Sequence, residues 1–130
     1  MIKDILSFFL LFLFLNSCAQ KYPSGNYTII TEVDEIGTGN LIDMKFELHF
    51  EKSKMFLRVD TNISTEAYCE GEYSIKKNKN KILVSKYIGE GICSSDSRIN
   101  TIYIKKIENI YYIKSGRFNN DKWLKLKKVQ

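Results

Sequence analysis

The sequence is short of the residues from which most catalytic and metal sites are built. Histidine occurs once among 130 residues, as His49, and cysteine occurs three times. One histidine without neighbouring cysteines makes no zinc site, and a Ser-His-Asp triad would have to use His49 itself. The sequence also contains no glycine-rich phosphate-binding motif. We therefore expect a protein that is not an enzyme and that carries no metal or cofactor.

Proline and glycine are scarce as well, at one and seven residues, which argues against long disordered segments. The chain length fits one domain, and Ile, Tyr, Phe, Thr and Val are the residues that suit a pleated, half-buried surface. The net charge is +5. Many basic residues lie late in the chain: Lys105, Lys106, Lys114, Arg117, Lys122, Lys125, Lys127 and Lys128. They indicate either a solvated strand face or attraction to an anionic surface or an acidic partner.

The one long apolar run covers residues 5–15 and ends just before Ser17 and Cys18. A membrane-spanning helix needs roughly 20 residues, whereas the core of a secretory signal needs about 7–15. The run therefore predicts a signal peptide at residues 1–17, with Ser17 as the small residue before the cleavage site. An exported protein has little reason to bind nucleic acid.

The stretch Leu15-Asn16-Ser17-Cys18 resembles the lipobox of bacterial lipoproteins. In that family the cysteine thiol is diacylated, with chains such as palmitate, and becomes the mature N-terminus. The resemblance implies lipid attachment at Cys18, a lipidated tether at residues 18–24, and a place in the bacterial cell envelope. We expect the outer membrane, facing the periplasm or the surface. An ordinary secretory signal that is cut nearby is the alternative.

If Cys18 carries lipid, Cys69 and Cys93 remain as a pair, and outside the cytoplasm such a pair predicts a disulfide. Closing a loop of this length would stabilise the fold by roughly 3 kcal/mol. A hairpin turning about Asn78 and Lys79 would place Cys69 opposite residues near Ile88. Cys93 would then need a bulge or fold-back at Gly89 and Gly91 to reach it.

Alternation with a period of two dominates the rest of the chain, most clearly at residues 42–50, where apolar side chains alternate with charged or polar ones. That pattern is typical of a strand with one wet face. We expect strands at residues 27–33, 42–50, 55–60, 68–76, 81–88, 99–105, 110–115 and 123–129. The spacing predicts an all-β fold: a small antiparallel meander barrel of about eight strands in residues 25–130, after an N-terminal signal helix.

Two further resemblances involve the mature chain. Gly25-Asn26-Tyr27, the successive hairpins and Trp123-Leu124 together resemble small lipocalin-like lipoproteins of Gram-negative bacteria, in which an antiparallel barrel is expected and no activity is established. Residues 24–27 (Ser-Gly-Asn-Tyr) are similar to the first motif of periplasmic C-type lysozyme inhibitors. That motif is one residue longer, and the second inhibitor motif is absent here.

A few side chains deserve testing as sites. Glu66, Glu70 and Glu72 lie close in sequence, and paired carboxylates can perform acid–base chemistry, although a solvated face is the commoner role. Asp34 and Glu35 sit in a glycine-containing loop that lacks calcium-loop spacing. Aromatic residues are expected in the core or at a barrel mouth: Tyr68, Tyr87, Tyr103, Tyr111, Tyr112, Phe118 and Trp123.

Together these features predict a monomeric, non-enzymatic binding module, anchored to the membrane through lipid on Cys18. Its ligand would be a small apolar molecule or an envelope protein. The alternative function is a secreted or surface protein-interaction module, such as an inhibitor of a host or competitor enzyme.

The lipobox resemblance makes a prediction about the mature N-terminus. Mass spectrometry of the protein from its native envelope should find Cys18 as the first residue, carrying acyl chains. An unmodified N-terminus at any other residue would contradict the lipoprotein assignment.

Overall fold

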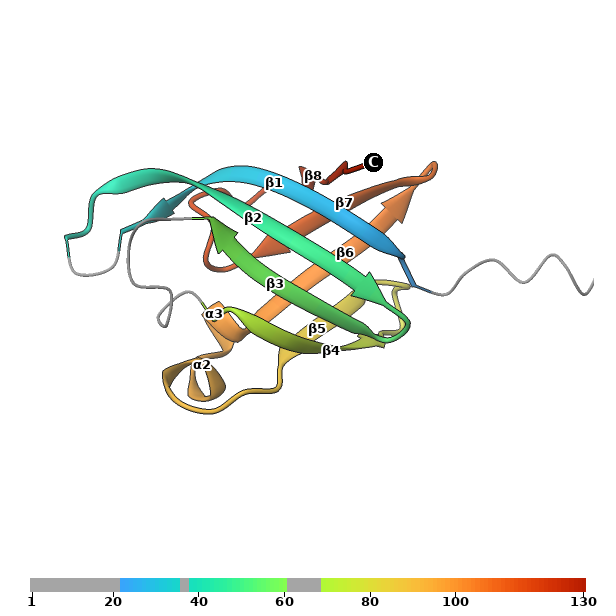
Figure 1. Ribbon diagram of the computed structural model, residues 1–130, viewed down its shortest axis with the longest axis horizontal. Coiled ribbons are helices and arrows are strands. Elements are labelled where there is room, and N and C mark those ends of the chain that lie inside the picture. Colours follow the sequence, from blue (N-terminus) through green and yellow to red (C-terminus); the bar gives the residue numbers. More distant parts are fainter. Residues whose placement is uncertain (1–21, 36–37, 61–68) are drawn as a thin grey trace, which may run out of the picture.

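A computed structural model describes residues 22–35, 38–60 and 69–130. The predicted signal peptide, Cys18, Glu66 and Tyr68 lie outside these residues. The described strands form one antiparallel sheet of nine strands, curled into a nearly closed barrel whose front and back strands cross in Figure 1. The all-β prediction, with an antiparallel meander barrel, is confirmed.

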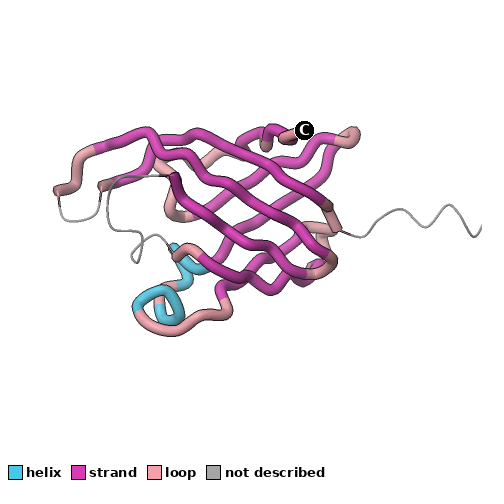
Figure 2. Tube along the Cα trace, in the orientation of Figure 1, coloured by secondary structure: helices cyan, strands magenta, loops and turns pink. Residues whose placement is uncertain are grey.

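The strands follow one another around the barrel in chain order, and two short helices separate the fifth and sixth strands (Figure 2). The elements are β1 (Gly25–Asp34), β2 (Leu41–Glu51), β3 (Lys54–Asp60), β4 (Gly71–Lys77), β5 (Leu83–Tyr87), α2 (Ile92–Ser95), α3 (Ser97–Asn100), β6 (Thr101–Ile107), β7 (Ile110–Ser115), β8 (Leu124–Lys125) and β9 (Lys127–Lys128).

The last strand expected from the sequence, 123–129, is divided between two neighbours. β8 pairs with β7 through Ile113 and Leu124, whereas β9 pairs with β1 through Thr28 and Lys127. The change of partner occurs at Leu126, whose side chain is buried. One short segment therefore joins the two edges of the sheet and closes the barrel.

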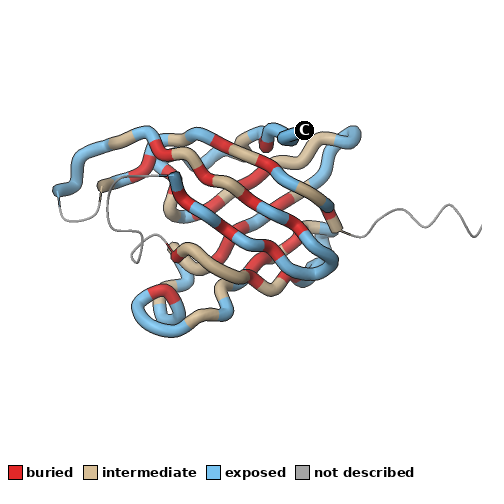
Figure 3. Tube along the Cα trace, viewed as in Figure 1, coloured by how far each residue is buried: buried red, intermediate tan, exposed pale blue. Residues whose placement is uncertain are grey.

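The barrel interior is filled by side chains from alternate strand positions, as the alternating buried and exposed residues in Figure 3 show. β2 and β3 alternate most strictly, so that Phe46 and Leu57 point inward while Glu47 and Arg58 face solvent. Burying a large apolar side chain contributes roughly 1.5–3 kcal/mol. The largest fully buried side chains are Tyr73, Phe46, Phe50, Met44, Leu48, Met55, Ile104 and Ile113.

The two ends of the barrel differ in construction. The end that we call the turn end holds the start of β1, the tight turns β2–β3, β4–β5 and β6–β7, and the C-terminal residues 126–130 (Figure 1). The opposite end, the helix end, holds α2, α3 and the β7–β8 loop. Of the predicted tether, Tyr22 packs against the core and Pro23 is fully buried, so these two residues belong to the folded domain.

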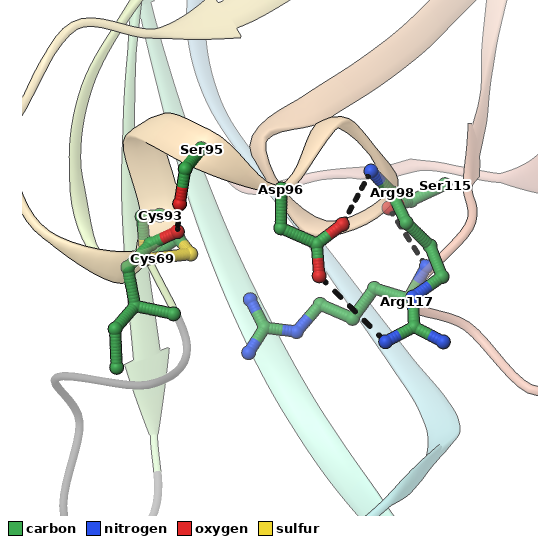
Figure 4. A network of polar contacts seen from close by, with 8 residues as sticks. Cys69, Cys93, Ser95, Asp96, Arg98, Ser115 and Arg117 are labelled. Carbon is green, nitrogen blue, oxygen red and sulfur yellow. Dashed lines mark hydrogen bonds and ion pairs between the residues drawn. A yellow bond between two sulfur atoms is a disulfide. The ribbon is translucent and has the colours of Figure 1, made fainter.

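A disulfide between Cys69 and Cys93 lies at the helix end, with 5.6 Å between the two Cα atoms (Figure 4). The predicted hairpin register is wrong by a few residues. Lys77 pairs with Leu83, so the chain turns about Asn80, and the same register would put Cys69 opposite Gly91. Cys93 is therefore only two residues past that position, and the α2 turn after Gly91 brings its sulfur to Cys69.

The α2 and α3 turns occupy residues that the sequence predicts as a polar loop and the start of a strand. Asp96 explains this difference, because its side chain accepts a hydrogen bond from the Arg98 N–H at 3.0 Å and thereby caps α3 (Figure 4). β6 consequently begins at Thr101 rather than residue 99. Each helix is a single turn, which is too short to produce a helical period in the sequence.

Tyr73 connects the packed interior to the disulfide. Its side chain is fully buried, and its hydroxyl donates a 2.7 Å hydrogen bond to the Cys69 carbonyl oxygen. Burial raises the pKa of the Tyr73 phenol well above its ordinary value, although the positive charge of Arg117 acts in the opposite direction. The folded protein thus holds this phenol in its neutral form.

The Tyr73→Phe variant should be less stable by about 1–2 kcal/mol, because the buried Cys69 carbonyl loses its donor. The melting temperature should fall by about 4–8 °C near neutral pH. Above about pH 10 an unfolded tyrosine ionises while folded Tyr73 stays protonated, so the parent protein loses stability there and the variant lacks this loss. Thermal melts between about pH 8 and about pH 11 should show that the difference in melting temperature between the parent protein and the variant becomes smaller as the pH rises. A difference in melting temperature that stays constant or grows with pH would contradict the buried, neutral state of the Tyr73 phenol.

Candidate functional site

His49 lies on the outer face of β2, as its place in the alternating pattern predicts. Its Nδ1 atom is 2.7 Å from the Asn26 side-chain oxygen, and its Nε2 atom is 3.9 Å from Glu51. A groove of about 400 Å³ runs beside it over β1, β2 and β3. The nearby Glu47 lies 3.7 Å from both Lys45 and Arg58. The polar groups of this surface thus bind one another, which is the usual arrangement of a solvated sheet face.

Glu70 and Glu72 serve separate structural contacts. The Glu70 carboxylate accepts a 2.6 Å hydrogen bond from the backbone N–H of Val59, and so holds the end of β3. Glu72 forms a 2.7 Å ion pair with Lys54 across the β3–β4 pair. No hydrogen bond or ion pair within the described part of the chain joins either carboxylate to His49. The structure therefore does not assemble these three residues into one acid–base site.

Neither a metal site nor a membrane-spanning helix is found in residues 22–35, 38–60 and 69–130. No three His, Cys, Asp or Glu side chains in these residues gather closely enough to hold a metal ion. No helix in these residues is long and apolar enough to cross a bilayer. Asp34 and Glu35 lie at the end of β1, where the Glu35 N–H donates to the Asn40 carbonyl across the β1–β2 loop.

The aromatic residues that we expected in the core or at a barrel mouth divide, where they are described, between the core and the surface. Phe118 is buried, and Tyr87 packs against the core with its ring centroid 5.5 Å from that of Tyr73. On the outer surface, Trp123 lies beneath the Lys105 ammonium group at 4.3 Å, and Tyr103 is 40% exposed. Tyr111 has a different role, because it lines a hollow on the molecule.

That hollow is a cleft of about 690 Å³ at the turn end, between the β6–β7 hairpin, β9 and the start of β1. Its origin is the change of partner at Leu126. The Leu126 N–H donates to the Tyr111 carbonyl, and the chain then departs to pair with β1, so no described strand pairs with the β7 side of the hairpin tip. The segment that closes the barrel therefore also forms this notch, which we call the basic cleft.

Four lysines line the basic cleft: Lys106, Lys125, Lys127 and Lys128. All four side chains are exposed, and no described residue that lines the cleft is acidic. Within the described part of the chain, no carboxylate lies within ion-pair distance of these lysines. Lys106 instead lies 5.6 Å from the centre of the Tyr111 ring. The described residues that line the cleft therefore give it a positive potential.

Apolar groups form the floor between these lysines. The rings of Tyr27 and Tyr111 meet edge to face with 5.7 Å between centroids, and the buried side chain of Leu126 lies with them. Burial raises the pKa of both phenols, and the neighbouring Tyr27 phenol raises the pKa of Tyr111 further. Both rings are therefore neutral at physiological pH and offer apolar surface and weak donors, with no charge to repel an anion.

The arrangement suits a ligand that carries an anionic group next to an apolar group. Lysine ammonium groups bind phosphate or carboxylate oxygens, and aromatic rings bury an adjacent hydrocarbon. The sequence indicates the excess of lysines late in the chain but not their position around a cleft. Lys106 and Lys127 belong to elements that pair with different neighbours, so only the change of partner at Leu126 brings them together.

Comparisons of this chain with protein-family models, with curated proteins and with solved structures find no match. The barrel and its basic cleft are therefore the features from which a function can be inferred.

Proposed function

We propose that this protein is a non-enzymatic binding module of the bacterial cell envelope, anchored by lipid on Cys18, and that it binds an anionic amphiphile in the basic cleft. The cleft carries this proposal because it combines four lysines, none ion-paired to a described carboxylate, with an aromatic floor in a volume that suits a small ligand. The interior of the barrel is occupied by side chains, so the cleft is the better place for a ligand.

The proposed anchor would hold the cleft close to the bilayer. Only residues 19–21 separate Cys18 from Tyr22, which packs against the barrel. Four residues of extended chain reach at most about 14 Å. Ser24, just beyond the buried Pro23, itself lines the cleft. A lipid or a lipid-derived ligand could therefore pass between the membrane and the cleft over a short distance.

In this arrangement the lysines would bind the head of the ligand and the floor would cover the first part of its tail. Lys106 and Lys128 approach from opposite sides of the cleft, because Lys106 is opposite Tyr111 in the β6–β7 hairpin and Lys128 is opposite Tyr27 in the β9–β1 pair. The side chains of Tyr27, Tyr111 and Leu126 lie between them. Such a ligand needs no enzyme chemistry, and its release needs no covalent step.

The alternative of a protein-interaction module has weaker support. The large apolar side chains that are exposed, among them Ile30, Phe56, Ile92 and Tyr103, come from separate elements. An interaction surface usually presents one contiguous apolar patch. We therefore assign the cleft, rather than an apolar face, as the functional site.

The test uses the chain from residue 19 onward, which keeps every described strand and the whole described core. Isothermal titration with dodecyl phosphate should give saturable binding near one ligand per protein, weakened by salt, whereas neutral dodecanol should bind more weakly. The Lys106→Gln/Lys128→Gln variant should lose about tenfold or more in affinity, because charge-assisted contacts are removed.

The matched control is Lys77→Gln/Lys79→Gln, which removes the same charge from the β4–β5 turn, outside the cleft. It should bind dodecyl phosphate within about twofold of the parent protein, since screening limits long-range effects. Equal losses in both variants, or equal binding of dodecanol, would overturn the assignment of the cleft.

A further inference from the structure

The charges of the barrel are divided unevenly between its two ends. At the turn end, residues 51–54, 76–82, 106–110 and 126–130 contain the basic residues Lys52, Lys54, Lys76, Lys77, Lys79, Lys81, Lys106, Lys127 and Lys128. The acidic side chains in the same residues are Glu51 and Glu108. The helix end mixes both signs, with Asp34, Glu35, Asp60, Glu90, Asp96 and Asp121 beside Arg98, Lys114, Arg117 and Lys122.

This division is a property of the fold and cannot be seen in the net charge. The strand register brings the β2–β3, β4–β5 and β6–β7 turns to one end, although they are far apart in the sequence. The Ile75 N–H donates to the Ser53 carbonyl at 2.9 Å, which ties the β2–β3 turn to β4, the strand that leads into the β4–β5 turn. The lysines of separate turns therefore form one positive surface, and in the described chain only Lys54 among them has an ion-pair partner, Glu72.

The same end receives the N-terminal segment. Tyr22 and Pro23 lead into β1 beside the β2–β3 turn, where Gly25 is opposite Phe50. A lipid anchor on Cys18 would therefore place the positive end, and not the helix end, against the bilayer. Each basic residue close to an anionic leaflet adds to binding, and the attraction falls off within about 8 Å at physiological salt.

We infer that the turn end of the barrel is a docking surface for the anionic headgroups of a phospholipid bilayer. The lysines of the three turns and of β9 contact the headgroups, and the basic cleft opens onto the membrane surface. This inference uses the proposed lipid anchor only to explain why the turn end faces the bilayer. The attraction itself comes from the lysines and needs no lipid on the protein.

The experiment measures cosedimentation of the chain from residue 19 onward with vesicles, so that no acyl chain contributes. Vesicles of phosphatidylcholine mixed with phosphatidylglycerol should bind the protein, binding should weaken steeply with salt, and pure phosphatidylcholine vesicles should not bind it. The Lys76→Gln/Lys77→Gln/Lys79→Gln variant should lose roughly a hundredfold in affinity for the anionic vesicles.

The matched control, Lys86→Gln/Lys114→Gln/Lys122→Gln, removes the same charge away from the turn end and should keep most of the binding. Equal losses in the two variants would overturn the inference, because only net charge would then matter. Tighter binding to a nucleic acid or to an acidic protein than to anionic vesicles would overturn it as well.

Ligand binding in the basic cleft and membrane docking of the turn end can be disproved independently of each other. The Lys76→Gln/Lys77→Gln/Lys79→Gln variant should still bind dodecyl phosphate, since none of its substituted residues lines the cleft. If this variant loses vesicle binding but binds dodecyl phosphate as the parent protein does, the result supports docking through the lysines of the turns. Vesicle binding that survives in this variant but is abolished by Lys106→Gln/Lys128→Gln would assign the membrane contact to the cleft alone and would overturn the wider surface.

Discussion

The pairing of residues 124–128 with both edges of the sheet is the constraint on which the rest of the structure depends. β8 pairs with β7 and β9 pairs with β1, and without this segment the two edges would lose their ladder partners at the turn end. Unpaired edges expose backbone donors and acceptors and invite aggregation. The two edges of the sheet, β1 and β7, meet along one seam. At the helix end of this seam, Phe118 forms a β-bridge with Val33, and the Asn119 side chain donates a hydrogen bond to Glu32 at 2.7 Å. The seam is thus closed at both ends by residues that follow β7.

Closure has a functional consequence because the change of partner at Leu126 leaves a notch. The hairpin tip on one side and β9 on the other supply lysines, and Tyr27 and Tyr111 close the bottom. The meander places this notch at the end where the lysine-bearing turns gather and where the N-terminal segment joins the barrel. The positive surface and the cleft therefore lie at the end of the packed barrel where the proposed anchor would join it, and the disulfide and the helices stabilise the other end.

Much of the fold could be predicted from the sequence, because period-two alternation reports directly which face of a strand is buried. β2 shows this most plainly, with Met44, Phe46 and Leu48 buried. The pairing of Cys69 with Cys93 followed from counting cysteines. The register near Asn80, the two single-turn helices and the change of partner at Leu126 could not be predicted, since they depend on local caps and on contacts between distant segments. The basic cleft depends on that change of partner, so the sequence revealed its lysines but not their grouping.

Hydrogen–deuterium exchange of individual amides, followed by NMR, tests the closure most directly. The Leu126 and Val129 amides donate to the carbonyls of Tyr111 and Asn26, each at 2.9 Å. If this segment closes the barrel, both amides should exchange with protection close to that of the β1 and β7 amides. Exchange as fast as in an unstructured tail, with β1 and β7 still protected, would contradict the account, because the basic cleft would then lack one of its walls.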